Sequence, residues 1–237
     1  GKTVSLESIS GSINNITRAE QATLIARGKS GSVNIADTLT GAEASIRAAD
    51  SLRMTAGNDI TLRGAAVSSG GDLLMQAENN IAVAENQINS AYITSGFGAK
   101  RDTGQSSAGA KGSSITAGGN LVQVAGNNLT VTASSVSAGE NALLSAGNDL
   151  SLNAAATHQT QSDRTRETHT TGAVVSTVTA GDSLTLSSGR DISSQAAKIA
   201  AENNITLQAG RDVNLLAEAS TEGSSDISKN KKEINES

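Results

Sequence analysis

Residues 48–83, which read AADSLRMTAGNDITLRGAAVSSGGDLLMQAENNIAV, decide the fold. A short phrase recurs within them: a small residue, then residues such as Gly, Asn and Asp, then a run rich in Ile, Leu and Val. The phrase begins at positions 48, 56, 69 and 77, then at 117, 125, 138 and 146, and again at 180, 188, 201 and 209. All three blocks have the same steps. Within a block the first and third starts are twenty-one positions apart, as are the second and fourth, so the repeat unit contains two related halves. A fixed period of about 20 residues is typical of solenoid proteins.

The composition requires a narrow interior. The 237 residues include one Phe, one Tyr, no Trp, no Pro, no Cys and 24 Gly. Since aromatic side chains supply much of the buried area of an ordinary core, this chain must build its core from Ile, Leu, Val and Ala. The formal net charge is −5, and no basic face of the kind that nucleic acids need is visible, so we expect no nucleic-acid partner.

Each repeat unit predicts short strands, because runs of four to six residues between Gly-Asn and Gly-Asp turns are too short for helices. We therefore predict an all-β fold, a parallel β-helix with rungs of about 21 residues and three strands per rung. Side chains alternate across a strand. In the first block the residues expected to point inward are Ile60, Leu62, Leu73 and Met75.

Residues one repeat unit apart should form columns through the stacked rungs. A third column is predicted from Ile46, Val67 and Ile88, from Val136 and Thr157, and from Ile199 and Ser220. In the less regular residues 1–45, Ile13 and Val33 are assigned to one column with Leu52, in slightly shorter rungs. The part from residue 48 onward then predicts about nine rungs and a rod of roughly 43 Å.

The turns repeat as well. Gly57, Gly126, Gly147, Gly189 and Gly210 occupy one position of the phrase, and we expect positive φ there. Two residues later an Asp or Asn recurs, which could bond to backbone within its turn or to the next rung's copy. Arg190 and Arg211 should offset the repulsion between Asp191 and Asp212. A calcium ladder is the alternative, but the tandem nonapeptide that binds calcium does not occur, so turn chemistry is preferred.

Two inserts interrupt the period, at about 90–114 and 158–178. We predict one β-helix repeat domain over 1–220 that carries both, and a truncated third insert or flexible tail over 221–237. The pattern stops in mid-unit and residue 1 is not Met, so we expect a fragment of a longer protein. The inserts should leave one corner and form a row on one face, where solenoids often place binding sites.

The candidate interaction residues lie in these inserts: Tyr92, Phe97, Lys100, Arg101, His158, Arg164, Arg166 and His169. The two aromatic residues could contact a partner, or they could fold back over the side of the solenoid. The two histidines, in a hairpin that turns near 163–166, could lie roughly opposite each other and bind metal or sense pH. No Cys or close acidic partner is visible to complete a ligand set, so a solvated polar hairpin is preferred and no metal or cofactor is predicted.

Catalysis is not predicted. Some parallel β-helices act on polysaccharides, which needs clustered carboxylates and usually aromatic platforms for sugar. Here Asp and Asn recur once per rung, which indicates architecture, and the aromatic pair sits on an insert.

Three features together resemble a known family: the repeated AGND-[IL]-x-L phrase, SGFG at 95–98, and GSSITAGGNL at 112–121. They resemble the haemagglutinin repeats of filamentous haemagglutinin and of contact-dependent growth inhibition effectors. The resemblance implies a right-handed parallel β-helix in a large exoprotein, exported across the Gram-negative outer membrane by a partner transporter in two-partner secretion. It implies a location that is secreted or at the cell surface, and no catalytic residues.

The function implied is that of a structural and interaction segment in toxin delivery to neighbouring bacteria. Its partner would be a cell-surface receptor or the outer membrane of the target cell, reached through the parent protein. The alternatives are an adhesin segment that binds host cells and, more remotely, a polysaccharide-active enzyme. Unpaired strand edges at the two ends of the solenoid would also permit end-to-end self-association.

Overall fold

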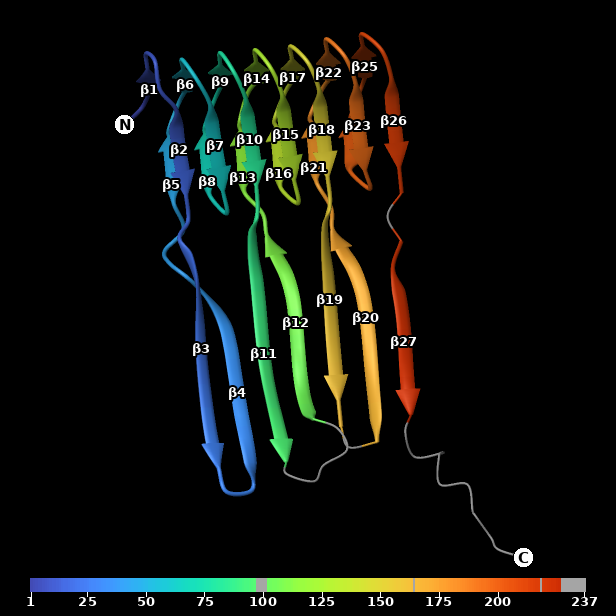
Figure 1. Ribbon diagram of the computed structural model, residues 1–237. Coiled ribbons are helices and arrows are strands. Elements are labelled where there is room, and N and C mark those ends of the chain that lie inside the picture. The colour runs from blue at the N-terminus through green and yellow to red at the C-terminus, as the bar shows by residue number, and fades with distance from the viewer. Residues whose placement is uncertain (97–101, 164, 218, 227–237) are drawn as a thin grey trace, which may run out of the picture.

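The computed structural model describes residues 1–96, 102–163, 165–217 and 219–226. All regular structure in these residues is β, as predicted, and falls into strands β1 to β27. Figure 1 shows two parts: a stack of short strands, and long hairpins that project from one side of it. Among the described residues, no helix is present that could cross a membrane.

The stack consists of three parallel sheets, which we call the first, second and third sheets. The first sheet contains β1 (Val4–Ser8), β6 (Leu52–Ala56), β9 (Leu73–Ala77), β14 (Leu121–Ala125), β17 (Ala142–Ala146), β22 (Leu184–Ser188) and β25 (Ile205–Ala209). The second contains β2 (Ile13–Ile16), β7 (Ile60–Arg63), β10 (Ile81–Ala84), β15 (Leu129–Thr132), β18 (Leu150–Asn153), β23 (Ile192–Gln195) and β26 (Val213–Leu216). The third contains β5 (Ser45–Ala48), β8 (Ala66–Ser69), β13 (Ser114–Ala117), β16 (Ser135–Ala138), β21 (Thr177–Ala180) and β24 (Lys198–Ala201).

The chain visits the three sheets in turn, so the architecture is the predicted β-helix solenoid. Seven strands in each of the first two sheets mean seven described rungs, numbered here from the N-terminus. Nine rungs were predicted from residue 48 onward, where six of the seven lie, because the prediction counted hairpin residues as rungs. Leu52 pairs with Leu73, one repeat unit later, whereas Leu73 pairs with Leu121, more than two units later, because a hairpin intervenes. Seven rungs span about 29 Å.

The core is a file of aliphatic side chains along the inside of the three sheets. Ile60, Leu62, Leu73 and Met75 are all buried, as predicted from strand alternation. In the described part of the chain no aromatic side chain joins this core. Polar side chains join it in places: Ser69, Ser188 and Ser194 are buried in the inward columns. Gln123 is fully buried in the column between Met75 and Leu144.

The corner glycines are needed for a different reason from the one predicted. None of the five has positive φ. Instead, a Cβ at Gly126 would lie 2.1 Å from the Glu78 carbonyl oxygen of the preceding rung, and one at Gly147 would lie 2.0 Å from the Gly126 oxygen. The rungs approach so closely at this corner that the carbonyl oxygen of one rung occupies the space that a side chain on the corner residue of the next rung would need.

The Asp and Asn side chains at the same corner link successive rungs. Asp59 Oδ1 accepts from the Asn80 backbone N–H at 3.0 Å, and Asn80 Oδ1 accepts from the Asn128 N–H at 3.1 Å. The ladder continues through Asp149 and Asp191. Of the two bonding modes predicted for these residues, the structure shows the link to the next rung's copy.

Arginines neutralise this ladder where Asp residues follow one another. The Arg190 guanidinium lies 3.3 Å from Asp149, and Arg211 forms an ion pair with Asp191. The hydrogen bond from Arg211 lowers the pKa of Asp191 below its usual value. The compensation predicted from the sequence therefore involves the Asp of the preceding rung in each case.

The corner between the second and third sheets takes two forms. In rungs 2, 4 and 6 it is a tight turn with one residue in the left-handed region, at Gly64 (φ 54°), Ala133 (φ 46°) and Ala196 (φ 55°). In rungs 1, 3 and 5 the chain leaves this corner as a hairpin and returns to it, and after rung 7 it leaves as β27. The prediction that all excursions leave one corner is confirmed.

The predicted third column is partly wrong. Ile46, Val67, Val136 and Ile199 do share it, with Ile115 and Val178 between them. Ile88 and Thr157 instead lie in hairpin strands, and Ser220 precedes another strand of the hairpin sheet. Val67 and Ile88 are one repeat unit apart only because β11 begins where a third-sheet strand would begin if the chain made a tight turn there.

The N-terminal column is wrong for a related reason. Ile13 pairs with Ile60, and Leu52 pairs with Val4, so both belong to the solenoid but to different sheets. Val33 lies in a hairpin of its own. Residues 19–40 are thus a further excursion that sequence reasoning did not detect.

Candidate interaction surface

The hairpins form one continuous antiparallel sheet, which we call the hairpin sheet. Its strands are β3 (Ala19–Gly28), β4 (Gly31–Thr40), β11 (Asn86–Gly96), β12 (Thr103–Lys111), β19 (Ala155–Ser162), β20 (Arg166–Val174) and β27 (Thr221–Asp226). Besides the pairing within each hairpin, β4 pairs with β11, β12 with β19, and β20 with β27. The strands start earlier than the inserts predicted at about 90–114 and 158–178, and β27 falls in the segment predicted as a truncated insert or tail.

The pairing between hairpins follows from their spacing along the rod. Neighbouring strands of a sheet lie about 4.8 Å apart, so one hairpin contributes about 9.6 Å of sheet width. Hairpins leave alternate rungs, which are also about 9.6 Å apart. A hairpin on every rung would crowd its neighbours, and one on every third rung would leave a gap. Alternation lets the hairpin sheet and the rod extend together.

Both faces of the hairpin sheet are open to solvent. Among its described residues only Asn86 and Ala155, both at the base, are buried. In Figure 1 the sheet extends away from the rod and no other strand crosses it. Its strands are therefore held by their ladder hydrogen bonds and cross-strand pairs.

Buried polar groups hold the base of the first two hairpins. Thr17 Oγ1 donates to the Gly64 carbonyl at 2.6 Å, and Asn86 Nδ2 donates to the Thr17 carbonyl at 2.8 Å. On the return side, Ser113 Oγ donates to the Ala84 carbonyl at 2.7 Å and accepts from the Ala65 N–H at 3.1 Å. These bonds reach backbone groups at the point where the chain leaves and rejoins the rod, among them the Thr17 and Gly64 carbonyls and the Ala65 N–H.

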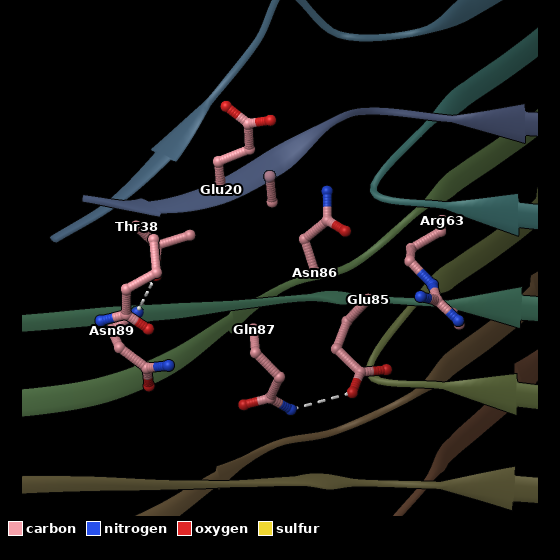
Figure 2. Close-up of a pocket in the computed structure, with 10 residues that line it drawn as sticks. Glu20, Thr38, Arg63, Glu85, Asn86, Gln87 and Asn89 are labelled. Atoms are coloured by element: carbon pink, nitrogen blue, oxygen red, sulfur yellow. Dashed lines mark hydrogen bonds between the residues drawn. The ribbon is translucent and has the colours of Figure 1, made fainter.

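A cavity of about 530 Å³ lies at this base, between the first and second hairpins. Figure 2 shows that its lining is polar, with Glu20, Arg63, Glu85 and Gln87 around it. Gln87 Nε2 donates to Glu85 Oε1 at 3.0 Å, so these two groups satisfy each other. The lining mixes both charges and contains no aromatic side chain, which gives it no preference for one ligand chemistry.

Tyr92 stands in the middle of the hairpin sheet. It pairs with Ile35 on one side and with Gln105 on the other, and its side chain is 48% exposed. Ile35 in turn pairs with Leu24, which is 61% exposed. Within this row Tyr92 therefore separates two apolar side chains on β3 and β4 from the amides of Gln105 and Gln161 on β12 and β19.

His158 and His169 lie on the opposite face of the sheet from Tyr92. His158 pairs with Thr171 and His169 with Thr160, so the two rings are diagonal neighbours and not directly opposite. His169 Nε2 lies 2.8 Å from Glu167 Oε1. The sequence analysis expected no close acidic partner, and Glu167 is one. Among the described residues no group of three or more His, Cys, Asp and Glu could hold a metal ion.

The turn predicted near 163–166 is confirmed and joins β19 to β20. The Asp163 N–H donates to the Arg166 carbonyl at 2.8 Å, and Asp163 Oδ1 accepts from the Thr165 and Arg166 N–H groups, each at 2.7 Å. These bonds, led by the one from Thr165, lower the pKa of Asp163. Arg166 itself begins β20 and is exposed. The other candidates, Phe97, Lys100, Arg101 and Arg164, lie outside the described residues.

Sequence reasoning missed several side chains that the sheet brings beside Tyr92, namely Leu24, Ile35, Gln105 and Gln161. Their alternating pattern was visible, but a strand with both faces exposed has the same pattern as a strand of the rod. Only the register between hairpins places these residues in one row.

Comparison with known proteins identifies the repeats. The family model described as hemagglutinin repeat matches residues 2–99, 93–167 and 159–235. The chain is 54% identical over 202 residues, 85% of its length, to "tRNA nuclease CdiA" of Escherichia coli O6:K15:H31 (strain 536 / UPEC). It is 38% identical over 236 residues, 100% of its length, to the protein of the same name from Escherichia coli strain STEC_O31.

A shorter match, 54% identical over 68 residues and 29% of the chain, is to "16S rRNA endonuclease CdiA" of Enterobacter cloacae subsp. cloacae. The chain spans only 6%, 5% and 2% of these three relatives. No solved structure matches the chain. The family model covers most of the chain and agrees with the resemblance drawn from the repeated phrases. The chain belongs to the hemagglutinin-repeat family, and its repeats are similar to those of CdiA-type proteins.

Proposed function

We propose that this chain is a non-catalytic structural and interaction segment of a large exported protein of a Gram-negative bacterial surface, and that the parent protein delivers a toxin to neighbouring bacteria. The relatives carry the names "tRNA nuclease CdiA", "16S rRNA endonuclease CdiA" and "Toxin CdiA". The chain spans a small part of each, and the proposal assigns the nuclease to other parts of those proteins. The segment's own contribution is to present a surface to the target cell, and a partner transporter exports the parent.

The observation that carries this proposal is the hairpin sheet. It takes up a large share of each two-rung unit, yet it buries almost nothing and contributes no core residue among those described. A sheet exposed on both faces and supported along its base by a rigid rod is suited to contact another surface.

The experiment removes one hairpin without breaking the rod. Residues 85–113 are replaced by the Gly-Ala pair that closes the same corner at Gly64 and Ala65. The replacement is made in the full-length parent protein, and export, attachment to target bacteria and toxin delivery are measured separately. We expect export and the strand content of the segment to be retained and toxin delivery to be lost.

A matched control replaces Asn89 and Ser106 by Ala, on the face of the same hairpin that points away from Tyr92. It keeps the hairpin and its backbone pairing, and delivery should be retained. Unchanged delivery after removal of the hairpin would contradict the proposal. Loss of attachment to host cells with delivery to bacteria intact would favour the adhesin alternative.

A further inference from the structure

Building on the proposed function, we propose that the row formed by Tyr92, Gln105 and Gln161 on the hairpin sheet binds a neutral sugar chain. The row would give the segment a glycan on the opposing cell surface as its partner.

The register places these three side chains side by side. Tyr92 pairs with Gln105, Gln105 with Gln161, and Gln161 with Thr168. Paired residues of an antiparallel sheet point to the same face, with Cβ atoms about 5 Å apart. Tyr92, Gln105 and Gln161 line a cavity of about 220 Å³ together with Gly104 and Ser162, which is the size of a single sugar ring.

The chemistry of the row matches a pyranose. The ring of Tyr92 offers a flat apolar surface for the C–H face of a sugar, with a hydroxyl at its edge. A Gln amide offers both donors and an acceptor, as neighbouring sugar hydroxyls require. The row contains no charged side chain, and this favours a neutral sugar over a sialylated or sulfated one.

The amides are free to bind. In the described part of the chain neither Gln105 nor Gln161 has a side-chain hydrogen-bond partner, and both are exposed. Nearby polar side chains are engaged: Thr94 bonds to Thr103 at 2.6 Å, and Ser90 donates to Asp37 at 2.6 Å.

Glycine keeps the floor of the cavity open. Gly104 has φ 152°, and a Cβ there would lie 2.0 Å from the Tyr92 carbonyl oxygen. Any other residue would clash with the β11 backbone and push β12 away from it.

The next row on the same face extends the site along the strands. There Ser107 pairs with Gln159, and Gln159 pairs with Thr170. These amide and hydroxyl groups, which lie between Asp37 and Glu222 in the same row, suit a chain of sugars better than a single one.

The test uses the whole chain and three neutral probes: maltohexaose, cellohexaose and chitohexaose. The chain has one Tyr and no Trp, so its tyrosine fluorescence reports on Tyr92 directly. We expect at least one probe to change this fluorescence in a saturable way, with the same dissociation constant by calorimetry. Tyr92→Ala should weaken the calorimetric binding at least tenfold, and the double change Gln105→Ala and Gln161→Ala about tenfold. Tyr92→Phe keeps the ring and should retain most of the affinity.

Asn34→Ala, on the opposite face of β4, is the matched control and should leave binding unchanged. Absence of binding by all three probes, or binding that Tyr92→Ala leaves intact, would overturn the proposal. Capture of an apolar peptide that depends on Leu24 and Ile35 but not on Gln161 would also overturn it, in favour of a protein partner. These results are independent of the hairpin-removal experiment, which can succeed while the sugar proposal fails.

Discussion

The rod and the hairpin sheet are both made of short β-strands, but different forces specify them. In rungs 2 to 5 every second strand residue is buried in the core file, and the corner glycines are constrained by the backbone of the preceding rung. In the hairpin sheet almost no side chain is buried, and strand pairing holds the structure beyond the buried polar groups at its base. Sequence in the rod is therefore restricted by packing, whereas sequence in the sheet is free to serve recognition.

The largest expected effect comes from shortening one leucine side chain in each part and comparing the losses of stability. Leu144 is fully buried, so Leu144→Ala should cost about 2–5 kcal/mol of unfolding free energy. Leu24 is 61% exposed, and Leu24→Ala should change it by less than about 0.5 kcal/mol. Urea denaturation followed by circular dichroism measures both. Similar losses in the two variants would mean that the hairpin sheet is covered in solution.

A second test removes the largest polar side chain buried inside the rod. Gln123 is fully buried, its Nε2 reaches only the Met75 sulfur at 3.6 Å, and its Oε1 has no partner. Gln123→Leu should stabilise the protein by about 1–3 kcal/mol in the same urea experiment, because an unsatisfied buried amide is removed. Destabilisation would show that the amide has a partner in solution, such as a bound water.

A third test concerns the corner at which the two parts meet. Gly64 has φ 54°, and a Cβ there would lie 2.5 Å from Asn86 Nδ2, so Gly64→Ala should destabilise by about 1–2 kcal/mol. Ala196 occupies the equivalent corner with φ 55°, so Ala196→Gly should stabilise by about 0.5–1 kcal/mol. Thermal melting compares the pair, and effects of the same sign would contradict the strain described.

The smallest expected effect is on pH dependence. Asp191 in the rod and Asp163 in the hairpin turn both have lowered pKa values, from Arg211 and from the Thr165 N–H respectively. A lowered pKa in the folded state stabilises the protein above the unfolded value, and that contribution is lost as pH falls through the folded value. This contribution to stability should therefore be lost at pH values below 3.8 in both cases.

Asp191→Asn and Asp163→Asn isolate the two contributions. Each should flatten the acid limb of stability below pH 3.8, and added salt should weaken the effect of Asp191 more, because its partner is an exposed charge. Urea midpoints across this pH range measure the effect. An unaltered acid limb in Asp191→Asn would mean that the ion pair with Arg211 does not form in solution.

Periodicity predicted the rod well because burial imposes it. Ile60, Leu62, Leu73 and Met75 recur with their neighbours at fixed spacing since each must fill the same narrow interior. The boundary errors at Ile88 and Thr157 arose where the chain keeps its strand-like alternation while it leaves the rod. Alternation alone does not distinguish a strand packed on a core from one exposed on both faces.

The first hairpin was missed for the same reason, since residues 19–40 alternate as the rod does and carry no turn phrase of the repeat. Tyr92 was singled out as a rare aromatic residue, but its neighbours Gln105 and Gln161 were not. They come from different hairpins, and only the pairing of β12 with β19 joins them. Register between separate excursions leaves no local pattern in the sequence.

The match in spacing between hairpins and rungs also limits how such a protein can change length during evolution. Equivalent positions recur in the first sheet every two rungs, at Val4, Leu73, Ala142 and Ile205. Each pair of rungs with its hairpin is therefore one structural repeat. Duplication or loss of a whole unit preserves every edge of the hairpin sheet. Gain of a single rung would separate two hairpins by an extra strand width and leave both with open edges, so viable family members should differ by even numbers of rungs.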